Sequence, residues 1–486
     1  MIHRKSMKWI IQLSIMFWQS LFLVIAEESE KIQGPNFANY LANDIKLKKL
    51  ALEVQKIQLE SEKSAVNNGL TCKLSTGNIV FRTNGDDSTV TFTPNASVSV
   101  PQAANLSLSA SSEIKIGSLT ENEKENKAVT LKVSVDLLSG ISEKRKVALL
   151  KAERNVLEAK RAFQNRALEV EQEYFKELRE LYSAASSIVS AQKELYEDTI
   201  KFEEIKAKGY SAGSSKYRSA QMEVLSDEHD IETKIRNLDH DCVVFAKKCG
   251  SDYKPEMHPE DFLPAELPLV VPVDVLSFDR NDFTKIENAI WEQKINGMER
   301  KTQKDLTLSA NGGYTFNNSN TTTSADTVNA GLDLGFKGIT LGGEISIPIG
   351  EENTNPVYTI SASIEPNQIR LRNIEKKQNN ISEKEEELSV KSAMDDYETA
   401  VVDQQTSLAD IQWSKKTTEE TYLMYVDLEQ DMAKLLEQGV TTRSEYLAAK
   451  SNLRLYEIKK LLNEIDLILY NDGTKLLFCR DGEIQE

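Results

Sequence analysis

A glycine near the C-terminal end of the chain is followed by hydroxyl side chains and then by an acid, in the segment EQGVTTRSEYLAAKSNL (437–453). Glycine tolerates a positive φ angle, so Gly439 suits a sharp reversal of a helix. The hydroxyl groups after it can accept hydrogen bonds from free backbone amides and so cap a helix that starts again. Glu445 would lie in the first turn of this returning helix, where the helix dipole favours an acid. The segment therefore predicts the tip of a helical hairpin.

The remaining side chains offer little chemistry beyond four cysteines, Cys72, Cys242, Cys249 and Cys479. Cys242 and Cys249 could form a disulfide if the chain bends between them, but on one straight helix they would lie roughly 10 Å apart, too far for a bridge. Both alternatives stay open. The sequence has no G-x-S-x-G motif, no Walker motif and no Cys/His cluster with metal-ligand spacing. We expect no enzymatic activity, no cofactor and no bound metal.

The N-terminal residues MIHRKSMKWIIQLSIMFWQSLFLVIAEES predict a secretory signal peptide over residues 1–26. Basic residues precede an apolar run that ends at Ala26, where cleavage is expected. A membrane anchor is the alternative. No later stretch approaches the ~20 apolar residues that a membrane helix needs. The net charge of −17 argues against nucleic acid as a partner, because phosphates would repel the chain.

Two long amphipathic helices are predicted, over about 140–208 and 367–437. The first has an apolar stripe with steps of three or four, and a second stripe beside it at strict sevens: Leu168, Phe175, Tyr182, Val189 and Tyr196. Two adjacent stripes mean that this helix packs against a neighbour on each side. Such helices suit a bundle, or a wall of helices closed into a tube.

Two other stretches, 76–135 and 305–364, are poor in charge and rich in Ser, Thr, Asn and Gly, and their apolar residues alternate. Alternation over segments of about 10 residues is typical of a membrane β-barrel. A soluble antiparallel sheet with one wet face alternates in the same way. The small polar residues on the second face and the export signal favour the barrel.

The order of these elements repeats, which predicts an α+β chain built from a duplicated unit. Val135 precedes Gly209 by nearly the same separation as Ile364 precedes Gly439. Within each repeat, a helix leads to strands and then to a long-helix hairpin. The predicted parts are the first repeat (27–249, tip near 209), a proline-rich connector (250–275), the second repeat (276–470, tip near 439) and a C-terminal tail (471–486).

In this organisation the sequence resembles the TolC family of outer-membrane efflux proteins, over nearly the whole mature chain. The family pattern is a tip glycine, a polar Ser/Thr stretch, an acid about six positions on and an Ala-rich helix. The second tip matches it with Gly439, Thr441, Thr442, Glu445, Leu447 and Ala449. The first tip, KGYSAGSSKYRSAQMEV (208–224), matches with Gly209, Ser211, Ser214, Ser215 and Ala220, and lacks the acid. Pro366 matches the family's exit from strand to helix.

The resemblance implies a homotrimer that shares one outer-membrane β-barrel, continued by a long periplasmic α-helical barrel. Substrates would pass through it passively, with energy supplied by an inner-membrane pump (RND, MFS or ABC type) joined through a periplasmic adaptor. Family members usually give two strands per repeat, which favours a twelve-stranded barrel. Each strand block here shows up to four alternating segments, and 336–339 could be a tight hairpin or a bulge, so a larger barrel stays open.

The resemblance also places function at the tips. Partner docking is expected at Gly209, Tyr210, Ser211, Gly439, Val440 and Thr441. A gate is expected at Glu445, with Arg443 and Ser215 near it, although Glu445 could instead only cap its helix. An exported coiled-coil or surface protein without a pore is the alternative function. Efflux and type I secretion are not separated by the sequence.

Overall fold

The computed structural model describes residues 37–84, 87–101, 104–117, 127–138, 140–254, 262–318, 326–350 and 355–479. The predicted signal peptide lies outside these residues. The chain divides into a helical unit (Met1–Leu52, Lys160–Glu287 and Asp395–Glu486) and a sheet unit (Glu53–Ala159 and Asn288–Met394). Each unit is described by itself.

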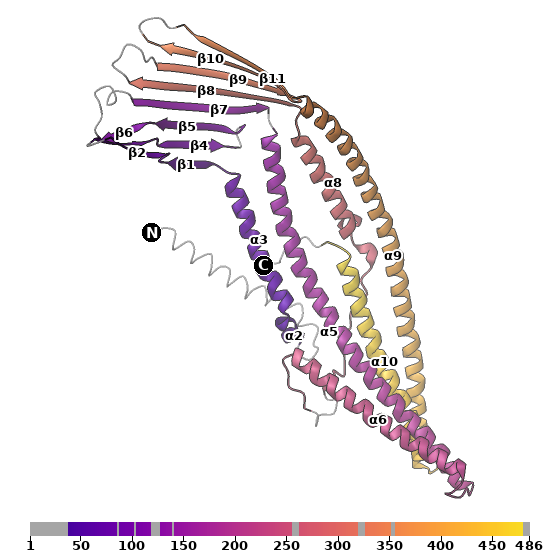
Figure 1. Ribbon diagram of the computed structural model, residues 1–486. Helices are drawn as coiled ribbons and strands as arrows, with labels where there is room; N and C mark the ends of the chain where they lie inside the picture. The colour runs from indigo at the N-terminus through magenta and orange to yellow at the C-terminus, as the bar shows by residue number, and fades with distance from the viewer. Residues whose placement is uncertain are drawn as a thin grey trace. The chain divides into compact units, whose positions relative to one another are not determined.

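The chain is an α+β protein whose helices match the periodic stretches of the sequence (Figure 1). The helices are α2 (Phe37–Asn43), α3 (Ile45–Asn67), α5 (Ile141–Ala207), α6 (Ser215–Lys248), α8 (Thr284–Thr302), α9 (Pro366–Glu437) and α10 (Arg443–Leu476), with short 3-10 turns η1 (Val275–Ser277) and η2 (Arg280–Asp282). The predicted long helices are confirmed as α5 and α9. Helix α10 continues past residue 470, where the sequence analysis placed the end of the second repeat.

The core of the helical unit lies along α5, where both predicted stripes are buried. Tyr174, Phe175 and Leu178 have no exposed surface. The ring of Tyr174 contacts Phe37 of α2 and Phe245 of α6 at centroid distances of 5.1 and 5.3 Å. The Tyr174 ring of α5 therefore joins three helices, because it packs against both α2 and α6.

The connector after α6 packs on the helical unit. The hydroxyl of Tyr182 donates to the Pro264 carbonyl, and Asn471 of α10 bonds the backbone on both sides of Pro272. Its amide oxygen accepts from Val273 N at 2.8 Å, and its amide nitrogen donates to Val271 O at 3.0 Å. These bonds satisfy backbone groups that the prolines leave without sheet or helix partners.

The sheet unit contains an eight-stranded antiparallel sheet with the order β1-β4-β5-β7-β8-β9-β10-β11. The first repeat supplies β1 (Thr71–Ser75), β4 (Asn95–Val100), β5 (Leu106–Ser112) and β7 (Lys127–Leu138). The second supplies β8 (Leu306–Asn318), β9 (Asp326–Phe336), β10 (Ile339–Ile349) and β11 (Val357–Ile364). Each repeat thus gives four strands to this sheet, and the two-strand expectation behind a twelve-stranded barrel is wrong.

The register places apolar residues opposite one another across all eight strands. One row of paired residues runs Cys72, Val98, Leu108, Val133, Gly312, Ala330, Ile345 and Tyr358. The neighbouring row on the other face contains polar residues, such as Ser97, Ser109 and Lys132. The sheet therefore has one continuous apolar face and one polar face, because side chains alternate along each strand.

Residues 336–339 form a tight hairpin, the first of the two alternatives for this segment. Lys337 and Gly338 have φ angles of 48° and 87°, and Phe336 pairs with Ile339 across the turn. Positive φ at both central residues is the geometry of a two-residue hairpin loop that matches the twist of its strands.

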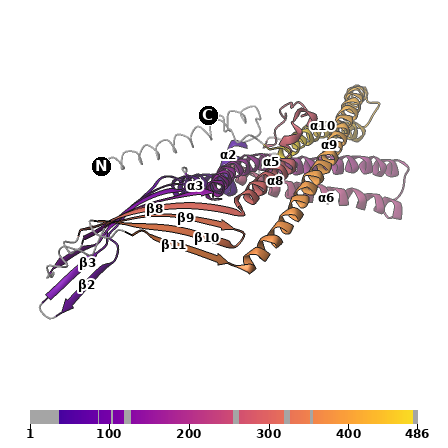
Figure 2. The ribbon, with the colours of Figure 1, turned by 90° about the horizontal axis from the view of Figure 1, so that it is seen from above.

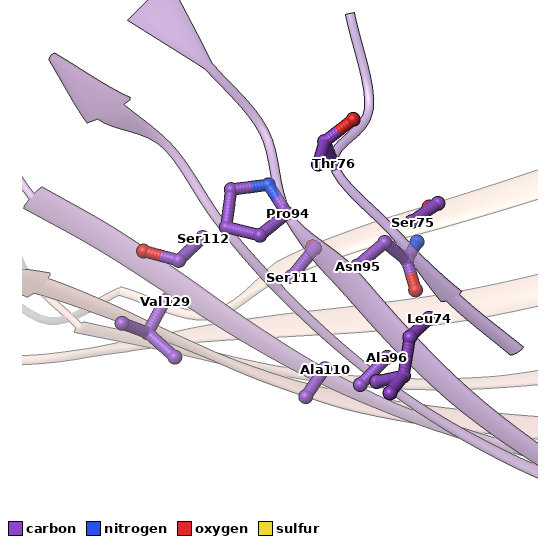
Figure 3. Close-up of a pocket in the computed structure, with 10 residues that line it drawn as sticks. All are labelled: Leu74, Ser75, Thr76, Pro94, Asn95, Ala96, Ala110, Ser111, Ser112 and Val129. Atoms are coloured by element: carbon purple, nitrogen blue, oxygen red, sulfur yellow. The ribbon is translucent and has the colours of Figure 1, made fainter.

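Three first-repeat strands continue beyond the eight-stranded sheet as a second sheet, β2-β3-β6. It consists of β2 (Ile79–Asn84), β3 (Asp87–Phe92) and β6 (Ile114–Gly117), which follow β1, precede β4 and follow β5. Figure 2 shows the β2–β3 hairpin projecting from the larger sheet. Gly77, with φ of 65°, and Pro94 lie where the strands change sheets. A cavity of about 420 Å³ lies at this bend, lined by residues such as Leu74, Pro94 and Val129 (Figure 3).

Candidate functional site

The two hairpin tips reverse the chain with the same backbone hydrogen bonds. At the first tip, Gly209 N donates to Lys206 O at 3.0 Å and Tyr210 N donates to Ile205 O at 3.4 Å. At the second, Gly439 N donates to Leu436 O and Val440 N to Leu435 O, at 3.0 and 2.9 Å. This pattern is the Schellman motif. The φ angles of Gly209 and Gly439 are 77° and 69°, so both glycines are needed for their conformation.

The returning helix of the second tip begins with a capping box. Thr442 Oγ1 accepts from Glu445 N at 3.3 Å, and a Glu445 carboxylate oxygen accepts from Thr442 N at 2.7 Å. The hydroxyls of Thr441 and Thr442 donate to the same oxygen at 2.6 and 2.9 Å. These donors, Thr441 first, hold the pKa of Glu445 below its usual value. The carboxylate therefore fixes the start of α10 as an anion.

The first tip is capped without an acid. Ser214 Oγ accepts from Tyr217 N at 3.3 Å, and the first turn of α6 contains no acidic residue. Two lysines of this tip lie over aromatic rings. Lys216 Nζ lies 5.3 Å from the Tyr210 ring centre, and Lys206 Nζ lies 3.9 Å from that of Phe202. The sequence analysis missed these pairs, although the i,i+4 spacing of Phe202 and Lys206 is a usable signal.

The predicted gate residues do not form one cluster in the described part of the chain. Arg443 and Ser215 are exposed and are the first residues of α10 and α6. Among the residues that the structure describes, neither forms a hydrogen bond with Glu445, whose partners are Thr441 and Thr442.

The predicted docking residues present apolar surface at both tips. Tyr210 is 39% exposed and Val440 is 70% exposed. Added Cβ atoms at Gly209 and Gly439 would meet nothing within 4 Å, so the space beside both glycines is open. An exposed apolar side chain beside an open backbone is a surface that a partner could cover.

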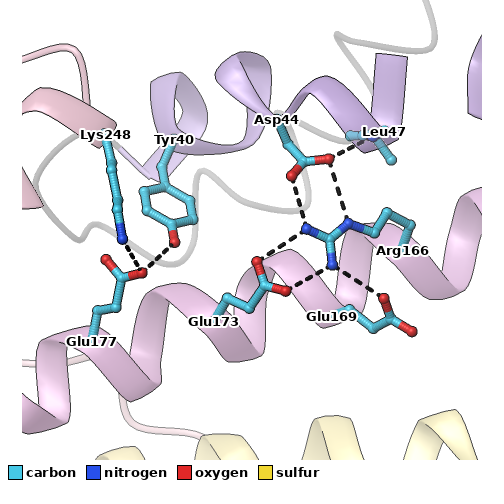
Figure 4. Close-up of polar contacts among 8 residues, drawn as sticks. All are labelled: Tyr40, Asp44, Leu47, Arg166, Glu169, Glu173, Glu177 and Lys248. Atoms are coloured by element: carbon cyan, nitrogen blue, oxygen red, sulfur yellow. Dashed lines mark hydrogen bonds and ion pairs between the residues drawn. The ribbon is translucent and has the colours of Figure 1, made fainter. Parts of the chain in front are cut away.

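Away from the tips, a cluster of charged residues joins α5 to the start of α3 (Figure 4). The buried Arg166 guanidinium lies 2.8 Å from Asp44 and 2.8 Å from Glu173. Burial alone would raise the pKa of Asp44, but hydrogen bonds from Arg166 and the Leu47 amide outweigh it and lower that pKa. Sequence reasoning missed this cluster because Asp44 and Arg166 are far apart along the chain. The charged groups of this cluster form ion pairs and hydrogen bonds with one another, which indicates a role in stability.

Cys242 and Cys249 are free, so the unpaired alternative holds in this structure. Both are buried, Cys242 within α6 and Cys249 at its C-cap. Burial raises the pKa of each thiol to about 12. The thiols are therefore neutral near pH 7 and pack as small apolar groups.

A second cavity, of about 1080 Å³, lies within the helical unit. Helix residues such as Leu238 and Ile458 line it, together with connector residues 263–267 and the charged Arg454 and Glu457. None of the helices in the described ranges is both long enough and apolar enough to cross a membrane.

Two family models match the chain. The model described as the TP096X N-terminal domain matches residues 37–271, and the model described as the TP096X C-terminal domain matches residues 268–481. The chain belongs to the TP096X family. Its two TP096X domains meet at residues 268–271, inside the proline-rich connector, and each domain carries one of the hairpin tips.

Solved structures similar to this TP096X chain include three outer-membrane proteins. The MtrE channel of Neisseria gonorrhoeae has 12% sequence identity and a TM-score of 0.45, and the match covers 92% of this chain and 89% of that one. VceC of Vibrio cholerae has 13% identity and a TM-score of 0.44, with 91% of this chain and 94% of that one covered. The CmeC channel of Campylobacter jejuni has 10% identity and a TM-score of 0.43, with 94% of this chain and 91% of that one covered. No curated protein sequence matches the chain.

Proposed function

We propose that this protein is the exit duct of a tripartite efflux or type I secretion system, located in the outer membrane with a large periplasmic part. Solutes would pass passively from the periplasmic tunnel to the exterior. The observation that carries this proposal is the eight-stranded sheet, whose apolar residues share one face in register while small polar residues share the other. Membrane β-barrels have this division between lipid and lumen.

A closed assembly of identical chains follows from the same sheet. In lipid, the backbone groups of an open edge have no water to bond, and each unpaired group costs several kcal/mol. Addition of the same sheet from other copies would remove the edges, and cyclic symmetry closes such an assembly. The resemblance to the TolC family favours a homotrimer.

The hairpin tips are the proposed contact with the rest of the system. A periplasmic adaptor and an inner-membrane pump (RND, MFS or ABC type) would supply energy, because the chain itself has no nucleotide-binding motif. Tyr210 and Val440 are the exposed apolar side chains that an adaptor would cover. Gating by Glu445 remains part of the proposal, through neighbouring tips that approach one another in the closed state.

Planar-bilayer recording of the purified full chain tests the duct. We expect trimers to show a stable ionic conductance under an applied voltage. Glu445→Arg is expected to change the ion selectivity or the conductance. Glu437→Arg is the matched control. Glu437 is exposed at the end of α9, and this substitution makes the same change of charge outside the capping box. If both variants and the native chain have the same conductance and ion selectivity, the gating role of Glu445 is refuted, but the duct is not. A trimer without any conductance would refute the duct, and the absence of both trimer and conductance would support the alternative of an exported structural protein.

A further inference from the structure

The eight-stranded sheet ends in two strands, β1 and β11, that each have one neighbour among the described strands. Both edges carry exposed apolar side chains. Leu74 of β1 is 86% exposed, and Ile360 and Ile364 of β11 are 86% and 66% exposed. Edges of this kind pair readily with another strand, which soluble proteins normally prevent with charges, prolines or covering elements.

The two edges are complementary in direction. Every neighbouring pair from β1 to β11 is antiparallel, and the sheet contains eight strands, so β1 and β11 run in opposite directions. β11 of one copy can therefore pair with β1 of a second copy as one more antiparallel pair. Their faces also agree, because Cys72 and Tyr358 belong to the same apolar row.

The register also shows how the edges would align. Cys72 lies at the end of β1 that follows α3, yet its row reaches Tyr358, at the end of β11 that is farther from α9. The sheet is thus staggered, as closure into a tilted barrel requires. When the helix-joined ends of β1 and β11 are brought level, Cys72 comes opposite Ala362 or Ile364, which share its face.

We propose that β11 of one copy pairs with β1 of the next, so that all eight strands of each chain enter the barrel wall. A trimer would then have twenty-four strands, eight from each of three copies. This inference rests on the proposed function and deepens it. Because barrel diameter grows roughly linearly with strand number, the barrel would be about twice as wide as one of twelve strands.

The polar face suits a large hydrated cargo. It presents mainly serine, threonine, asparagine and glycine, with a few charges such as Lys132, Asp333 and Glu344. Small polar groups leave space and bind water without fixing one ligand. The substrate class that fits this face is a large polar solute.

Cross-linking tests the seam. Ala362→Cys and Ile364→Cys are made in the full chain with native Cys72, and the membrane-inserted protein is oxidised. We expect covalent dimers and trimers from at least one variant, and none when Cys72→Ser is added. Ser363→Cys, on the opposite face of β11, is the matched control and should give few adducts. Trimers that form no adduct from either apolar-face cysteine would overturn the seam.

The width is tested separately by end-on electron microscopy of the purified oligomer beside a porin of sixteen to eighteen strands. We expect the ring of the barrel to be clearly wider than that of the porin. A ring narrower than the porin would overturn the count of twenty-four strands. If the seam and the wide ring are found but bilayers show no conductance, the proposed duct fails while this inference stands.

Discussion

At the first hairpin tip, residues 206–218 carry four basic side chains and no acid, whereas the corresponding residues of the second tip, 436–448, carry two acids and one arginine. The backbone does not differ in this way. Both tips end a helix in a Schellman motif with glycine at positive φ, and both begin the next helix with a hydroxyl cap. The comparison teaches that the reversal constrains glycine and the cap, while the charge of the tip is free to vary.

The strands of the two repeats differ in a second way. The first repeat has short strands in the main sheet, such as β1 and β4, and continues them past a bend into β2-β3-β6. The second repeat has long, uninterrupted strands, such as β8 and β10. The two repeats therefore give equal numbers of strands to the eight-stranded sheet, with the same alternation, but their strands differ in length.

The largest expected difference between the repeats concerns the ion pairs that join their helices. Arg166 is buried between Asp44 and Glu173, whereas the pair of Lys285 and Asp396 in the second repeat is 63% and 45% exposed. Arg166→Met should lower the free energy of unfolding by about 3 kcal/mol, because Asp44 would be left as a buried charge without its main partner. Lys285→Met should lower it by less than about 1 kcal/mol.

Denaturant unfolding of the detergent-solubilised full chain, followed by circular dichroism, measures both variants. Asp44→Asn combined with Arg166→Met is the control, because it removes the stranded charge and should recover part of the loss. Similar losses from Arg166→Met and Lys285→Met would contradict the contrast between a buried and an exposed pair.

The next largest effect should be shared by the tips. Gly209→Ala and Gly439→Ala place a Cβ at positive φ, which costs roughly 1–2 kcal/mol, although the space beside each glycine is open. Hydrogen exchange at the tip amides reports the local opening free energy. Gly213→Ala is the matched control, since Gly213 lies in the same loop with equally open space and without positive φ. A loss at only one of the two tips would break their equivalence.

The sequence predicted the parts of this fold that depend on local pattern. The two adjacent stripes, one of them through Phe175 and Tyr182, predicted a helix buried on two sides, and the two glycines predicted the reversals. The number of strands could not be predicted, because alternation at Leu106 or Ile339 reads the same in a long bent strand and in a hairpin. The contact of Arg166 with Asp44 joins residues far apart along the chain, and periodicity carries no information on such pairs.

The contributions of the two helix caps to local stability should differ modestly between the tips. Thr442→Ala removes the hydroxyl that accepts from Glu445 N, and Ser214→Ala removes the one that accepts from Tyr217 N. Each should lower the local opening free energy of its hairpin by about 1 kcal/mol. Thr442→Ala should cost more, because it also removes a hydrogen bond to the Glu445 carboxylate. Hydrogen exchange in the first turns of α6 and α10 measures both. Thr442→Ser keeps the cap and should leave exchange nearly unchanged.

The smallest expected effect is a response to pH at one tip only. The pKa of Glu445 lies below its usual value of 4.5, so its carboxylate contributes stability that is full above about pH 4.5 and is lost as the pH falls through the lowered pKa. The side chain is close to solvent, which screens the interaction, so a few tenths of a kcal/mol are expected. Protection of the α10 amides should therefore decline on acidification, while that of the first turn of α6, which has no acid, should not. Glu445→Gln should remove the decline. A decline that persists in this variant would contradict its assignment to the Glu445 carboxylate.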